Sequence, residues 1–354
     1  MLRKRLHLRQ FHLILLILFI IIGCASSAGA KRKDDVVILK NGDRLTGEIK
    51  GLQHGELKFK ASYMADAVRL DWTKVERLES KDRYLIALTD GQLFTDFLRL
   101  SPAISTTDNF FIGGEHSALR VRQVAVLRIM PVEAGFFRQL EGTIDFGFSF
   151  TSGNDQYQTE FSASATYRRR DHSLTARLDS VFSGQPQGTS SRRNQFNLDY
   201  RKQLSPKWYA GGLFDLLRSD QQSLSLRTTF GGLIGRSLRQ TERTRISIFG
   251  GLAETRENYS ATTGKPVTTN TDALTGLDFN TFRFSKTDIN SRFILYPSLT
   301  AAGRMRMQFK SDLRIKIVKD LMWGFHIYEN FDSQPPVKAG KNDFSVSTSL
   351  GWKF

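Results

Sequence analysis

Apolar and polar residues alternate with a period of two over long stretches between about Leu140 and Phe354. In the first stretch, one face carries only large apolar side chains, those of Ile144, Phe146, Phe148 and Phe150. Successive side chains of a β-strand point to opposite faces, so a period of two is the signature of a strand. The pattern predicts strands with one apolar and one polar face.

Eleven further stretches repeat this pattern, and they begin near Tyr157, Ser173, Gln195, Trp208, Leu224, Arg245, Thr269, Asp288, Met305, Leu321 and Asp343. They exceed the mean strand length of about five to six residues in soluble proteins. Their connections alternate between short and long, as the periplasmic turns and outer loops of outer-membrane barrels do. Residues 139–354 are therefore predicted to form an antiparallel up-and-down transmembrane β-barrel of about 12 strands, in preference to a soluble β-sandwich.

The last predicted strand ends on an aromatic residue at the carboxyl terminus. Its apolar residues share one face and are Phe344, Val346, Leu350, Trp352 and Phe354. An unpaired apolar strand can be offered to the edge of another sheet. This pattern is similar to the terminal strand that the bacterial barrel assembly machinery recognises, so these residues are the predicted assembly signal.

Residues 1–30 have the features of an export signal, with a basic start and an apolar run over Phe11–Ile22 that only His12 interrupts. Two cleavage sites fit. One is the A-x-A sequence at Ala28–Ala30, and the other is a lipobox that would make Cys24 a lipidated first residue. Both interpretations take the protein out of the cytoplasm, so nucleic acid is not an expected partner despite the formal net charge of +16.

Residues 31–138 contain an internal repeat, with copies at about 34–80 and 83–131. The Asn41-Gly42 and Asp90-Gly91 dipeptides are equivalent, and both are favoured in type I′ hairpin turns. Each copy is predicted to be a small, bent SH3-like β-barrel or sheet, and the two are expected to pack together because fifty residues bury little surface. The module turn, comprising Asn41, Gly42, Asp43, Arg44, Asp90 and Gly91, is either a binding loop or simply a pair of hairpin turns.

The whole layout resembles the YdiY-like, salt-induced outer-membrane proteins of unknown function. The resemblance is carried by the stretch Asn41–Glu48, by Leu70–Trp72 and by Gly153-Asn154 in the first predicted outer loop. It implies an outer-membrane barrel and supplies no catalytic or ligand-binding residues. The second copy has Gln92-Leu93-Phe94 where the first has Asp43-Arg44-Leu45, which weakens any binding role shared by the two copies.

One predicted barrel strand places several cations on its polar face, namely Arg306, Lys310, Arg314 and Lys316. As a lumen ladder they would favour anions in an open pore. The alternative is a lumen closed by salt bridges to Asp145, Asp179, Asp199, Asp215 and Asp278, which suits the narrow interior of twelve strands. Outer-loop bases are expected to meet lipopolysaccharide phosphates, and these are Arg192, Arg193, Arg256 and Lys265.

Catalysis by a serine would need a base beside the nucleophile. His326 is the only histidine within a predicted barrel strand, and it faces the lumen; His172 falls in a turn. The sequence therefore predicts no enzyme, no cofactor and no metal site, and an outer-membrane hydrolase is disfavoured. It favours an anchor in the Gram-negative envelope, with the module in the periplasm gripping peptidoglycan or a protein, or a narrow solute channel; an anion-selective porin is the alternative.

Overall fold

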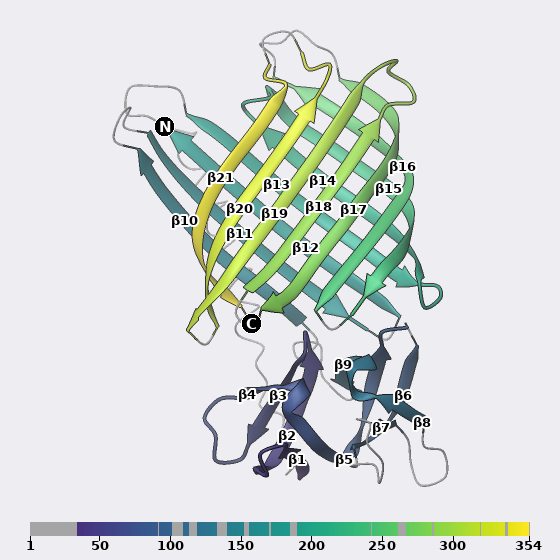
Figure 1. Cartoon of the computed structure of the whole chain (residues 1–354). Helices are drawn as coiled ribbons and strands as arrows, with labels where there is room; N and C mark the ends of the chain where they lie inside the picture. The colour runs from purple at the N-terminus through teal and green to yellow at the C-terminus, as the bar shows by residue number, and fades with distance from the viewer. Residues whose placement is uncertain are drawn as a thin grey trace, which may run out of the picture. The chain divides into compact units, whose positions relative to one another are not determined.

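The computed structural model describes residues 34–90, 92–100, 109–112, 119–132, 140–151, 156–169, 171–184, 190–241, 243–260, 267–284, 287–318, 320–336 and 339–353. The predicted export signal with Cys24, and also Gly91 and Phe354, lie outside these ranges. Strands make up most of the described chain and form two separate sheets (Figure 1). Within the described ranges, no helix is long and apolar enough to cross a bilayer.

The N-terminal sheet has nine strands in the order β4-β3-β2-β1-β5-β6-β7-β8, with β9 paired to β2 and β5. The strands are β1 (Asp35–Leu39), β2 (Arg44–Gln53), β3 (Glu56–Ala61), β4 (Val68–Asp71), β5 (Val75–Leu88), β6 (Leu93–Leu100), β7 (Asn109–Ile112), β8 (Leu119–Arg122) and β9 (Val126–Pro131). Its core holds one contiguous cluster of buried apolar side chains, including Ile49, Phe59, Trp72, Tyr84 and Ile129.

Each predicted copy contains one short 3-10 turn that joins two strands, η1 (Trp72–Lys74) in the first and η2 (Gln123–Ala125) in the second. Their equivalent first residues bond to each other. Trp72 Nε1 donates to the Gln123 carbonyl at 2.9 Å, and Gln123 Nε2 donates to the Trp72 carbonyl at 2.6 Å. These two hydrogen bonds join the parts of the sheet that contain the two predicted copies.

The two hairpin turns also match. The amide of Leu39 donates to the Asp43 carbonyl and that of Leu88 to the Gln92 carbonyl, each at 2.9 Å. The prediction of a type I′ turn at Asn41-Gly42 is wrong, because Gly42 has a φ of +89° but Asn41 does not have a positive φ. Asn41 Oδ1 instead accepts from the Asp43 amide at 3.1 Å, which closes the loop without a second left-handed residue.

The second sheet is a closed barrel of twelve antiparallel strands in sequence order, as predicted. They are β10 (Leu140–Thr151), β11 (Gln156–Arg168), β12 (His172–Gly184), β13 (Ser191–Gln203), β14 (Trp208–Ser219), β15 (Leu224–Gln240), β16 (Thr244–Tyr259), β17 (Thr268–Phe284), β18 (Thr287–Pro297), β19 (Met305–Val318), β20 (Leu321–Asp332) and β21 (Asn342–Lys353).

The outer surface of this barrel is apolar. Large side chains stand exposed at alternate positions around it, with Phe146 62% exposed and Leu252 58% exposed. A soluble protein rarely leaves so large an apolar surface uncovered. Lumen-facing residues between them are mostly charged, polar or small. An exception is one cluster of buried apolar side chains inside the barrel, which includes Leu213, Leu233, Phe249, Leu274 and Ile294.

Candidate functional site

The lumen is lined by the polar face of each strand, and its cations are held by carboxylates of other strands. On β19, Arg306, Asp312 and Arg314 are buried, whereas the flanking Met305 and Ile317 are exposed. The period-two alternation of the sequence therefore places alternate residues of β19 in the lumen and on the outer surface.

The predicted ladder of cations lies on this lumen face, and three of its four members form ion pairs. Arg306 Nη2 lies 2.5 Å from Asp272 Oδ2, Lys310 Nζ lies 2.6 Å from Asp179 Oδ1, and Arg314 Nη2 lies 2.9 Å from Asp145 Oδ2. Lys316 is half-buried and forms no ion pair with another described residue.

Several of these pairs cross the lumen. Lys310 on β19 reaches Asp179 on β12, and Arg292 on β18 reaches Asp199 on β13 at 2.7 Å. Asp278 on β17 binds Arg201 on β13 at 2.6 Å. Asp215 differs from the other predicted partners, because its carboxylate accepts from the amides of Gln195 and Asn197 and not from a cation.

A second charged network closes the end of the lumen that carries the longer loops. Arg304 lies in the loop between β18 and β19, and it binds Glu257 at 2.8 Å and Asp332 at 2.5 Å. Arg227 binds the same two carboxylates, at 2.7 and 3.3 Å respectively. This network could not be predicted from the sequence, because its members come from three strands and a loop. The only signal was the spacing of Arg304 two residues before Arg306.

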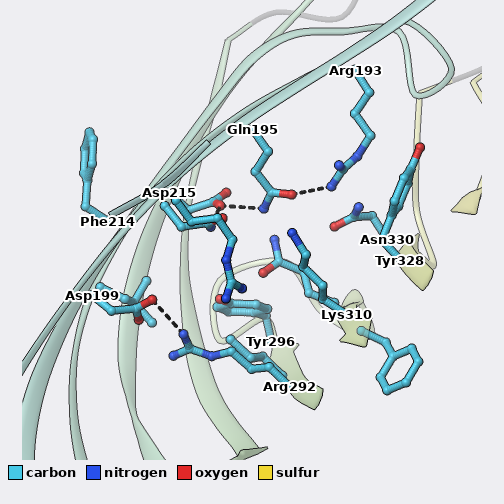
Figure 2. A pocket seen from close by; sticks show the side chains of 16 residues that line it. Arg193, Gln195, Asp199, Phe214, Asp215, Arg292, Tyr296, Lys310, Tyr328 and Asn330 are labelled. Atoms are coloured by element: carbon cyan, nitrogen blue, oxygen red, sulfur yellow. Dashed lines mark hydrogen bonds and ion pairs between the residues drawn. The ribbon is translucent and has the colours of Figure 1, made fainter. Parts of the chain in front are cut away.

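Between these layers lies a small cavity of about 60 Å³ (Figure 2). Figure 2 shows Arg193, Gln195 and Asp215 joined in one hydrogen-bonded row on one wall, and Arg292 bound to Asp199 below them. Tyr296 and Tyr328 add aromatic surface to the wall. Arg177 also lines the cavity, and it has no hydrogen bond or ion pair with another described residue.

The expectation that Arg193 is an outer-loop base is wrong. Its side chain is buried, with the guanidinium 3.9 Å from the centre of the Tyr328 ring and its Nε 3.4 Å from Asp343 Oδ2. Arg193 lies in a strand at an inward-facing position. Arg192 and Arg256 are exposed, and Lys265 lies outside the described residues.

The remaining predicted residues are dispersed. Asn41 and Asp43 bond to each other at 2.8 Å on an exposed turn, and Arg44 begins β2. Asp90 caps the equivalent turn by accepting from the Gln92 amide at 3.0 Å. On β21, the outward side chains of the predicted assembly signal are more than half exposed; they are Phe344, Val346, Leu350 and Trp352. No group of described His, Cys, Asp and Glu residues has the arrangement of a metal site.

Comparison with curated proteins finds no match. Among solved structures, the chain is similar to the NanC porin, with 12% identity, 60% of this chain and 98% of that chain covered, and a TM-score of 0.38. It is also similar to the translocator domain of the autotransporter NalP from Neisseria meningitidis, with 13% identity, 61% and 87% covered, and a TM-score of 0.34. The outer membrane channel DcaP of Acinetobacter baumannii matches at 9% identity, 90% and 94% covered, and a TM-score of 0.29.

The family model described as "Protein of unknown function, DUF481" matches residues 144–354, which include nearly all of the twelve-stranded barrel. This match is consistent with the resemblance found in the sequence. The chain belongs to this family of proteins of unknown function.

Proposed function

We propose that the protein is an outer-membrane barrel that anchors its N-terminal β-module in the periplasm, with a lumen closed by ion pairs. The even number of antiparallel strands, the apolar outer face and the alternation of short turns with longer loops support this placement. The module precedes the first strand, and so it belongs on the side of the short turns.

The observation that carries an anchor in preference to an open pore is the pairing of charges across the lumen. Arg292–Asp199 and Lys310–Asp179 each join strands on opposite walls, so they run through the space that a solute would use. A twelve-stranded barrel is narrow enough for side chains to fill much of it.

Epitope tags test this placement. A tag inserted after Ser260, in the loop that follows β16, should be labelled by antibody on intact cells. A tag inserted after Ser205, in the turn between β13 and β14, should be labelled only after the outer membrane is made permeable. The reverse result would contradict the proposed orientation.

Anchoring requires something for the module to hold, and we propose peptidoglycan or a periplasmic protein. The full-length protein should co-sediment with cell-wall sacculi, and a chain lacking residues 31–138 should not. Co-sedimentation of both forms would contradict binding through the module.

Two further partners are proposed. The exposed Arg192 and Arg256 would contact lipopolysaccharide, and the barrel assembly machinery would recognise β21.

A narrow anion channel is the second candidate, favoured by Arg177, which lines the lumen cavity without a hydrogen bond or ion pair to another described residue. A cation in this position would attract an anion that enters. If the barrel conducts, its reversal potential in a KCl gradient should favour chloride, and Arg177→Glu should shift it towards potassium. An unchanged reversal potential would rule out Arg177 as the selecting charge.

A further inference from the structure

Three neighbouring strands bring an aspartate, a histidine and a serine into one hydrogen-bonded chain inside the barrel. His326 Nδ1 on β20 lies 2.8 Å from Asp312 Oδ1 on β19. His326 Nε2 lies 2.7 Å from Ser349 Oγ on β21. The three residues are 2%, 3% and 4% exposed, so this chain is shielded from bulk water.

The connectivity is the one that activates a serine. The histidine tautomer with its proton on Nδ1 donates to Asp312, which fixes the ring and leaves Nε2 free to accept the Ser349 hydroxyl proton. The carboxylate also stabilises the imidazolium that forms when this proton moves. The arrangement could not be predicted from the sequence, because Asp312 and Ser349 approach His326 only after β19, β20 and β21 pair.

The backbone is shaped to let the serine reach the histidine. In the β20–β21 ladder Ser349 pairs with Gly324, whereas His326 pairs with Ser347. Ser349 and His326 are thus offset by two residues, which keeps both side chains on the lumen face. A Cβ at Gly324 would lie 2.5 Å from Ser349 Oγ and 2.7 Å from His326 Nε2. A side chain at this position would therefore break the contact, and glycine preserves it.

Ser349 also lies where the regular β10–β21 ladder ends. Beyond that point Gly147 still lies against the Thr348 carbonyl, and Ser347 donates to Glu160 of β11 on the lumen face. The ladder between β10 and β21 runs from Thr143–Lys353 to Phe146–Leu350 and stops one residue before Ser349. The β10–β11 ladder, in contrast, continues to Thr151–Gln156. Figure 1 shows β10 and β21 diverging towards the end where β10 finishes.

The edges of the seam between β10 and β21 are apolar. Phe148, Phe344 and Val346 are each more than half exposed on the outer face, next to the stretch in which the two strands are unpaired. Backbone N–H groups left without a ladder partner are costly in a bilayer.

We propose that Ser349 is the nucleophile of an acyl-transfer site that opens to the bilayer through the β10–β21 seam, with an ester of a membrane amphiphile as its substrate. This goes beyond the proposed anchor function and departs from the sequence-based expectation of no enzyme. It is separable from the anchor, because a barrel can hold the module in place with or without chemistry at its seam.

The reaction is a two-step ester hydrolysis. Ser349 Oγ attacks the carbonyl carbon while its proton passes to His326 Nε2. The bond from that carbon to the alcohol oxygen breaks, and the alcohol leaves with the proton, so that an acyl-serine remains. Water then attacks this ester with His326 again acting as base, which releases the carboxylic acid and restores the hydroxyl group.

The test is labelling of the purified full-length protein in micelles with a long-chain alkyl fluorophosphonate, which loses fluoride when a serine oxygen attacks phosphorus. We expect one labelled residue, Ser349, identified by mass spectrometry. Ser349→Ala should abolish labelling, and His326→Ala should slow it about a hundredfold or more. The matched control is Ser347→Ala, whose hydroxyl donates to Glu160 and not to a histidine, and which should be labelled like the wild type.

Only folded variants are compared. A variant counts as folded if heating shifts its electrophoretic mobility as it does that of the wild type. Absence of labelling in the wild type, or labelling that survives Ser349→Ala, would overturn the nucleophile. The route is tested with a short, charged fluorophosphonate, which should react at least tenfold more slowly; equal rates would overturn entry from the bilayer. Hydrolysis of 4-nitrophenyl palmitate that Ser349→Ala leaves unchanged would overturn the ester substrate.

Discussion

At the scale of single residues, the two sheets treat buried charge differently. Most buried barrel cations lie beside carboxylates, whereas the module buries one carboxylate among neutral donors. Asp35 accepts from the Ile49 amide at 2.8 Å, from the Tyr84 hydroxyl at 3.1 Å and from the Ser80 hydroxyl. Burial raises the pKa of Asp35 because these hydrogen bonds do not fully replace its hydration, and burial likewise raises the pKa of Tyr84.

The raised pKa of Asp35 predicts a pH-dependent module. The folded state binds the Asp35 proton more tightly than the unfolded state, so this contribution to stability is fully present below the ordinary aspartate pKa of about 4. It is lost as the pH rises through the folded-state pKa. The protection factor of the Ile49 amide, meaning its exchange rate in the unfolded chain divided by that in the full-length protein, should therefore fall over this interval. Asp35→Asn should flatten this change. A protection factor that rises with pH over this interval would contradict the predicted direction.

Arg304 offers the sharpest test of the charged lumen. Arg304→Ala leaves Glu257 and Asp332 with Arg227 as their only close cation among the described residues of the network. Removing one partner from a buried ion pair costs about 3–5 kcal/mol. Urea unfolding of the refolded barrel in micelles should show a loss of this size in the free energy of unfolding. The control is Arg256→Ala, which removes an exposed arginine next to Glu257 on β16 and should cost less than about 0.5 kcal/mol.

At the scale of elements, the twelve barrel strands were predictable and their partners were not. The predicted starts fall within a few residues of the observed ones, because outward and inward faces demand strict alternation, as Ile144 and Phe146 show. The pairs Lys310–Asp179 and Arg292–Asp199 depend on which walls face each other after closure. Sequence spacing carries no such information, and the Asp312–His326–Ser349 chain was hidden for the same reason.

The contact between the two module copies can be tested at Gln123. Its side-chain amide donates to the carbonyls of Trp72 and Val75 at 2.6 and 2.9 Å, and it is buried. Gln123→Ala leaves both carbonyls without this donor, which should cost about 1–3 kcal/mol. Hydrogen exchange across the module should quicken accordingly, whereas the exposed Gln92→Ala should change it little. Equal effects of the two variants would contradict the coupling of the copies.

The apolar outer face can be tested with two leucines of matched exposure. Leu252 lies within β16 and is 58% exposed, and Leu204 lies in the turn after β13 and is 59% exposed. In a bilayer, Leu252→Arg should cost about 2–4 kcal/mol and Leu204→Arg about 0–1 kcal/mol, because the cost depends on depth in the membrane. Urea unfolding in lipid vesicles measures both, and equal costs would contradict a membrane-spanning face.

At the scale of the whole molecule, the protein combines a duplicated β-module with a barrel whose apolar surface is outside and whose charges are inside and mostly paired. The formal net charge of +16, which by itself suggests a nucleic-acid partner, is divided between the predicted export signal (+4), residues 31–138 (+3) and residues 139–354 (+9). A closed lumen is the property that separates an anchor from a porin.

Single-channel recording in planar bilayers tests this property most directly. The full-length wild type should give no steady conductance, because Arg304, Arg227 and the cross-lumen pairs obstruct the path. The double variant Arg227→Gln with Arg304→Gln should show opening events, since its network is broken at the outer end. Steady open-channel current through the wild type would contradict the account.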